Sequence, residues 1–153
     1  ISQHTERGQY MTLEELKAEA VRLNNEAHDL LQKCGYEQLG ELDISHGLNP
    51  DEIYTYHMLN RFVTGLDTIA RYIDQLEAPI VRSGVLTKNN RGRYELNGRE
   101  FTCGSTIEFI RDCETPYWEA SRIEARNGEY YLVSDPEQKM EGLTVRVKEV
   151  NRP

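Results

Sequence analysis

Residues 69–85 carry the sequence IARYIDQLEAPIVRSGV, and the spacing of apolar side chains changes within this stretch. Up to Leu76 the apolar residues recur at intervals of three and four, which predicts a helix with one apolar stripe. Pro79 cannot continue a helix, because it lacks a backbone N–H group. Beyond it, apolar and polar residues alternate with a period of two, which is typical of strands. The stretch therefore predicts an α+β chain with a helical N-terminal half and a β-rich C-terminal half.

Two helices are expected before this boundary. Thr12 and Glu15 have the spacing of a capping box, which predicts a helix start at that point. Asn49 and Pro50 give a second start signal, since asparagine caps helices and proline fits the first helical position. Each helix carries an apolar stripe, and we expect the two stripes to face each other in an antiparallel helical hairpin. The stripes are Leu13, Leu16, Ala20, Leu23, Ala27 and Leu30, and Ile53, Tyr56, Leu59, Phe62, Leu66, Ile69, Ile73 and Leu76.

The C-terminal half contains seven short segments of strand character. Asn97-Gly98 and Asn127-Gly128 predict tight hairpin turns, because both central residues of a type I′ turn need positive φ. Many short strands in a small domain predict an antiparallel β-barrel of SH3-like type, which limits exposed strand edges. The segments are 80–88, 93–96, 99–102, 105–111, 117–125, 129–133 and 143–150. We therefore expect a disordered or tag-like tail over residues 1–10, the helical hairpin over 11–78 and the barrel over 79–150.

The composition of the 153 residues favours a protein partner over a nucleic acid. The formal net charge is −8 at pH 7, which repels phosphate backbones and attracts basic partners. Three cysteines without CxxC spacing, Cys34, Cys103 and Cys113, fit a reducing compartment. No apolar run approaches the roughly 18–20 residues of a membrane span. We expect a protein of the bacterial cytoplasm that does not enter a membrane.

The sequence contains no recognisable catalytic, metal-binding or nucleotide-binding motif. The histidines lie far apart, without the spacing of a zinc site: His4, His28, His46 and His57. Cys103 and Cys113 have no identifiable base that would lower a thiol pKa. The glycines are spread among turns, so that no phosphate-binding loop is present. We predict no catalytic residue, no metal and no cofactor, and a binding protein rather than an enzyme.

The candidate binding residues form a basic cluster in an otherwise acidic chain. They surround the first predicted hairpin and include aromatic neighbours: Lys88, Arg91, Arg93, Tyr94, Arg99 and Phe101, with Trp118 as a further aromatic anchor. Cations beside aromatic rings bind single-stranded RNA or DNA, or dock on an acidic protein surface. The alternative is a solvated strand edge protected by cations. Near Trp118, the acidic residues Asp112, Glu114 and Glu119 predict a patch of opposite charge that faces a basic groove.

Short motifs along the β half resemble a known family. They are Gly84-Val85-Leu86, Gly92-Arg93-Tyr94-Glu95, Gly104-Ser105-Thr106-Ile107-Glu108, Trp118, Arg122-Ile123-Glu124, Tyr130-Tyr131 and Gly142-Leu143 with Val145-Arg146-Val147. Their order resembles the family called domain of unknown function 5348, over roughly residues 83–148. Members of this family are small β domains of Gram-positive bacteria, often encoded on plasmids, conjugative elements and phages. The resemblance implies an accessory protein of a mobile element and supplies no catalytic residue.

The leading hypothesis is therefore a mobile-element or phage accessory protein that acts by binding a protein or nucleoprotein complex. A counter-defence inhibitor of the anti-CRISPR type is one form of this hypothesis. One alternative is a nucleic-acid-binding module or small RNase that uses the basic hairpin. Another is a structural or assembly protein that forms a homodimer through its helices.

Overall fold

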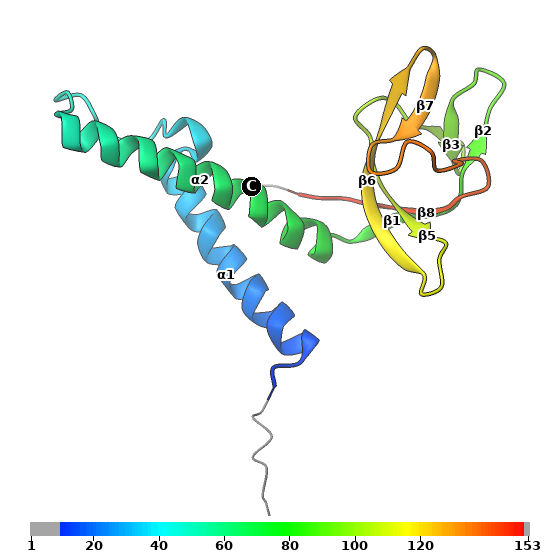
Figure 1. Ribbon diagram of the computed structural model, residues 1–153, viewed down its shortest axis with the longest axis horizontal. Coiled ribbons are helices and arrows are strands. Elements are labelled where there is room, and N and C mark those ends of the chain that lie inside the picture. Colours follow the sequence, from blue (N-terminus) through cyan, green and yellow to red (C-terminus); the bar gives the residue numbers. More distant parts are fainter. Residues whose placement is uncertain (1–9, 152–153) are drawn as a thin grey trace, which may run out of the picture. The chain divides into compact units, whose positions relative to one another are not determined.

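The computed structural model describes residues 10–151 (Figure 1). They form two compact units, residues 10–77 and residues 78–151, which we call the helical unit and the β unit. The expected tail over residues 1–10 lies outside the described residues, except for Tyr10. Helices and antiparallel sheets occur in separate units, so the predicted α+β class is confirmed. Neither helix among the described residues is long and apolar enough to cross a membrane.

The helical unit contains α1 (Leu13–Cys34), the short 3-10 helix η1 (Tyr36–Gln38) and α2 (Pro50–Glu77). The predicted capping box is present, because Thr12 Oγ1 accepts a hydrogen bond from Glu15 N and Glu15 Oε2 accepts one from Thr12 N. Gly35 ends α1 with a φ of 77°, a left-handed conformation that glycine adopts without strain. At the start of α2, Asn49 Oδ1 accepts from Glu52 N at 2.9 Å.

The buried core of the helical unit is small. It lies where η1 and the end of α1 meet α2, and it comprises Leu31, Cys34, Leu39 and Val63, with Tyr36, Tyr56 and Leu66 packed around them. Figure 1 shows the first half of α2 running on past the end of α1. No residue from 50 to 62 is buried, which agrees with this arrangement. The hydrophobic cluster of this unit therefore lies at one end of the helix pair.

The β unit contains two antiparallel sheets. The larger has the strand order β1-β8-β5-β6-β7, and the smaller has the order β2-β3-β4. The strands of the larger sheet are β1 (Ile80–Val85), β5 (Thr106–Arg111), β6 (Tyr117–Arg126), β7 (Glu129–Leu132) and β8 (Thr144–Lys148). Those of the smaller sheet are β2 (Thr87–Lys88), β3 (Tyr94–Leu96) and β4 (Arg99–Glu100). All seven predicted segments contain strand residues, and the first is split between the two sheets at Leu86.

The two predicted hairpin turns are confirmed. Asn97 and Gly98 have φ values of 51° and 78° and connect β3 to β4, where Leu96 pairs with Arg99. Asn127 and Gly128 have φ values of 53° and 80° and connect β6 to β7. Positive φ at both central positions is the requirement of a type I′ turn, which matches the twist of the flanking strands.

One hydrophobic core links the two sheets of the β unit. It consists of Leu86, Leu96, Phe101, Ile107, Phe109, Ile123, Leu132, Met140 and Val145. Leu86 bridges the sheets, since its backbone N–H donates to Leu143 O and its carbonyl accepts from Gly142 N, both at 2.9 Å. The described strands form two sheets and no closed barrel, where the sequence predicted a small, partly closed barrel. The SH3-like likeness stays a prediction.

Candidate protein interface

One side of the helix pair exposes large apolar side chains at seven-residue intervals. On α1 these are Leu16, Leu23 and Leu30, with exposed fractions of 55%, 55% and 42%. On α2 they are Phe62 and Ile69, with 56% and 57%. Seven residues make nearly two helical turns, so each row keeps to one side of its helix. Leu23 and Ile69 line the same groove, which places both rows on the same side of the pair. We call these five residues the heptad face.

The exposure of the heptad face contradicts the prediction that both apolar stripes are buried against each other. The surface of α2 that is buried holds Val63 and Ala70, which are 4% and 2% exposed. Each stripe is wider than the strip that two helices can bury between them. The outer row of each stripe therefore stays exposed, as Leu23 and Phe62 show. The seven-residue spacing of these apolar residues was visible in the sequence. The spacing alone did not show which row of each stripe the other helix would cover.

A groove of about 330 Å³ runs between the two rows. Ala27 and Ala70 line it and are both buried, so they form its floor. Leu23 and Ile69 stand on its two sides. Small residues on the floor and large residues at the sides leave room for the side chains of another helix to enter, as knobs enter holes in a coiled coil.

The polar contacts between the helices lie beside the groove, and one of their residues, Asn24, also lines it. Asn24 Nδ2 donates to Asp74 Oδ1 at 2.8 Å, and His28 Nε2 lies 2.7 Å from the same oxygen. Lys17 and Glu77 form an ion pair at 3.5 Å. Lys17 and Asn24 each follow a leucine of the heptad face by one residue, which places them about 100° further round the helix. These contacts hold the two helices together while the apolar side remains open.

The basic cluster around the first hairpin is largely an ion-pair network. Arg91 and Arg93 both pair with the carboxylate of Glu100, the second at 3.3 Å. Asn89 Nδ2 also donates to Glu100, at 2.8 Å. Partial burial of this carboxyl group acts to raise its pKa, but the hydrogen bonds from Arg91 and Asn89 outweigh it and hold the pKa of Glu100 below its ordinary value. Glu100 therefore offsets one of the two positive charges of Arg91 and Arg93.

The other candidate binding residues lie in three different settings. Lys88 sits over the ring of half-buried Tyr94, 5.8 Å from its centroid, and Arg99 is exposed on β4. Phe101 is only 3% exposed and belongs to the core, so its predicted place on a binding surface is wrong. Trp118 lies in the larger sheet, where the guanidinium group of Arg146 stacks 4.2 Å from the ring centroid. The structure thus brings the hairpin cations together and places Trp118 in another sheet.

The three residues of the predicted acidic patch near Trp118 lie in two different environments. Glu119 follows Trp118 on β6, and neighbouring residues of a strand point to opposite faces. Arg111 pairs with Glu119 at 2.6 Å and also with Asp135. The hydrogen bond from Arg111 lowers the pKa of Asp135 below its ordinary value. Asp112 and Glu114 are exposed. Glu119 is therefore part of an internal network of the β unit.

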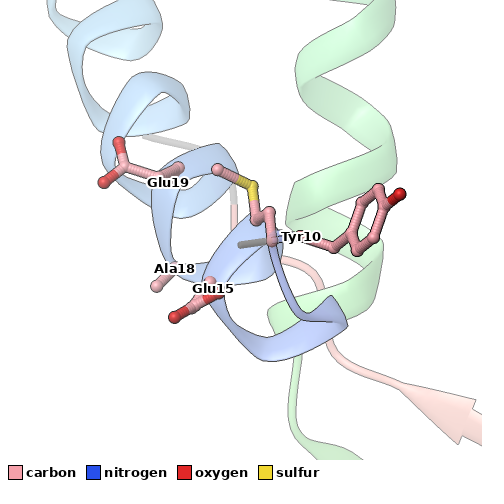
Figure 2. Close-up of a pocket in the computed structure, with 5 residues that line it drawn as sticks. Tyr10, Glu15, Ala18 and Glu19 are labelled. Carbon is pink, nitrogen blue, oxygen red and sulfur yellow. The ribbon is translucent and has the colours of Figure 1, made fainter. Parts of the chain in front are cut away.

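Two further hollows are shallow surface features. One, of about 460 Å³, lies at the start of α1, and its lining comes entirely from residues 10–19. Figure 2 shows Glu15, Ala18 and Glu19 on the first turns of the helix, with Tyr10 in the segment before it. Tyr10 is 86% exposed, so the hollow is open to solvent. The second, of about 350 Å³, lies between Ile110 and Leu143 in the β unit. Across residues 10–151, no three His, Cys, Asp or Glu side chains cluster as a metal site.

Comparison with known proteins finds one family match, which lies in the β unit. The family model of "Domain of unknown function (DUF5348)" matches residues 84–147. This match confirms the resemblance seen in the sequence. The matched segment runs from the end of β1 into β8, so it contains the smaller sheet and the larger sheet without most of β1, whereas the helical unit lies outside it. No curated protein matches the chain. No solved structure matches it either.

Proposed function

We propose that the protein acts by binding other protein chains and that the heptad face is the docking surface for their helices. The observation that carries this proposal is the exposure of five large apolar residues in two matched rows. Contiguous exposed apolar patches of a few hundred Å² mark interaction sites in soluble proteins. A groove between two helices accepts an amphipathic helix, whose apolar side chains recur at intervals of three, four and seven.

The distribution of charge supports a protein partner over a nucleic acid. Residues 10–77 contain thirteen acidic and five basic side chains, whereas residues 78–151 contain twelve and eleven. The unit that carries the heptad face therefore repels phosphate. In the β unit, the pairing of Arg91 and Arg93 with Glu100 reduces the charge that the hairpin offers to a nucleic acid. RNA or DNA binding through this hairpin, and a small RNase, stay predictions.

The β unit, which contains the DUF5348 match, gives the protein a second surface. We assign recognition of a further partner to this unit and assembly to the helices. Its exposed face includes Trp118 with Arg146 stacked on it, an aromatic and cationic pair of the kind enriched in protein interfaces. A counter-defence role in a mobile element is one form that such binding would take, and it stays a prediction, as does location in the bacterial cytoplasm.

Site-specific crosslinking tests the proposed docking surface. A photoreactive amino acid is introduced at Leu23 or at Ile69 of the full chain, and irradiated bacterial cells are examined for covalent protein adducts. The matched control is Ile44, which is 46% exposed but lies in the loop before α2. We expect strong adducts at Leu23 and Ile69 and weak ones at Ile44. Equal yields at the three positions, or none, would overturn the proposal.

A further inference from the structure

We infer that the chain docked on the heptad face is a second copy of this protein, so that two helical units close a four-helix bundle. The inference rests on the proposed function, because it names the occupant of the same surface. Two amphipathic helices have no second layer on which to bury their outer rows. A second identical pair supplies that layer, and four-helix bundles are the common closed form of such an arrangement.

The spacing of the apolar rows fits this partner. Leu16, Leu23 and Leu30 on α1 repeat every seven residues, and Phe62 and Ile69 on α2 repeat at the same interval. A seven-residue repeat is the period at which long helices pack with a small crossing angle, side chain into hole. Because both helices of the pair carry this period, one copy presents both the knobs and the holes that the other requires. A symmetric pair of copies thus has complementary surfaces without any further component.

The exposed apolar area is sufficient for a stable dimer. The heptad face is continued by apolar neighbours of similar exposure, Met58, Leu59 and Tyr72, which are 48%, 49% and 72% exposed. If a large apolar residue offers roughly 180 Å² when fully exposed, these eight residues present on the order of 800 Å². A standard protein interface buries about 800 Å² on each partner. The helical unit therefore has the area for one dimer contact.

The charges beside the heptad face favour a second copy over a basic helix. The acidic residues that border the α1 row are Glu19 and Glu26, and Arg22 already pairs with both, at 2.9 and 3.0 Å. On α2 the outer neighbours of Phe62 and Ile69 include Gly65 and Tyr72, which carry no charge. Arg22 offsets one of these two negative charges, so a single net negative charge borders the α1 row, which offers a basic helix little to bind. The net negative charge of each helical unit remains as a long-range repulsion, which salt screens.

Sedimentation of the purified full chain tests the inference. We expect a dimer of twice the 17.7 kDa chain mass, populated between about 1 and about 100 µM, with a dissociation constant that falls as salt is raised. The double variant Leu23→Gln, Ile69→Gln should weaken self-association at least about a hundredfold. The matched control Ile44→Gln should change it less than about threefold. Far-UV circular dichroism reports whether the helices of each variant remain.

Each outcome decides between the alternatives. A wild-type chain that stays monomeric up to about 100 µM overturns the inference. If a photoreactive residue at Leu23 then still crosslinks to a different protein, the proposed docking function is retained and that protein is the partner. Binding of that protein that weakens as salt is raised indicates a basic helix. If the double variant loses its helical signal, a second pair, Leu30→Gln and Phe62→Gln, repeats the measurement. Dimerisation of a folded variant as tight as that of the wild type overturns the inference.

Discussion

The β unit and the helical unit differ in how completely each buries its own apolar residues. The β unit encloses nine buried residues between two sheets, and Phe109, Ile123 and Val145 among them are fully buried. The helical unit has one hydrophobic cluster of four buried residues at one end of its helix pair, with Ala27 and Ala70 also buried, and it exposes the heptad face. The difference arises because two sheets cover each other's apolar faces, whereas two helices cover only one strip each. The β unit therefore buries its own apolar faces, whereas the helical unit leaves the heptad face exposed, where we propose that a partner docks.

The largest expected effect is in the core of the β unit. Phe109 is fully buried between the sheets, so Phe109→Ala should cost about 3–5 kcal/mol of unfolding free energy through the lost burial and the cavity left behind. Urea unfolding can be followed by the fluorescence of Trp118, the one tryptophan, which lies in this unit. The helical circular dichroism signal should keep its midpoint. A joint shift of both signals would show that the two units unfold together.

Leu30 and Leu31 are neighbours on α1, but Leu31 is buried and Leu30 is exposed, so the two leucines form a matched pair for substitution. Leu31 is fully buried, so Leu31→Ala should cost about 2–5 kcal/mol in helical stability at any protein concentration. Leu30 is 42% exposed, so Leu30→Ala should cost less in dilute protein and more at concentrations where the chain self-associates. Circular dichroism during urea unfolding at two concentrations measures both. Equal, concentration-independent losses would contradict the assignment of Leu30 to an interface.

Replacement of glycine by alanine should change the free energy of unfolding in opposite directions in the two units. Gly98 has a φ of 78°, so Gly98→Ala should destabilise the β unit by about 1–2 kcal/mol. Gly65 lies within α2 and has open space where a Cβ would stand, so Gly65→Ala should stabilise the helical unit by about 0.5–1 kcal/mol. Thermal unfolding with separate fluorescence and circular dichroism signals checks both changes. Destabilisation by Gly65→Ala would indicate that a neighbour approaches α2 closely at this point.

The smallest effect concerns the response of the β unit to acid. The pKa of Asp135 is lowered in the folded state, chiefly by the hydrogen bond from Arg111, relative to the ordinary value of 3.8. A lowered pKa contributes stability that is complete above the ordinary value and is lost as the pH falls through the lowered one. The urea midpoint of the Trp118 signal should therefore decline below about pH 4, and Asp135→Asn should flatten this decline. An identical acid profile in the variant would show that this ion pair contributes nothing.

The sequence predicted local structure better than it predicted which surfaces are covered. The capping box at Thr12 and the turns at Asn97 and Asn127 depend on a few neighbouring residues, and all three were found as predicted. The pairing of the strands into two sheets depends on long-range contacts, which explains why the sequence did not predict this strand order. Phe101 was placed on a surface because its neighbours are charged, although its own position faces the core. Periodicity predicted the apolar stripes, but not the flank of α2 against which α1 packs.

The first and last strands of the β unit lie side by side. β1 pairs with β8, and Glu149 N donates to Pro79 O at 3.0 Å, so the chain enters and leaves this unit at nearly the same point. A unit with adjacent ends can be inserted as a cassette into a surface loop of an unrelated host protein without spreading that loop apart. The same geometry permits circular permutation, with new ends opened at the Asn127-Gly128 turn. The adjacent ends of the β unit thus give it the geometry that domain insertion requires.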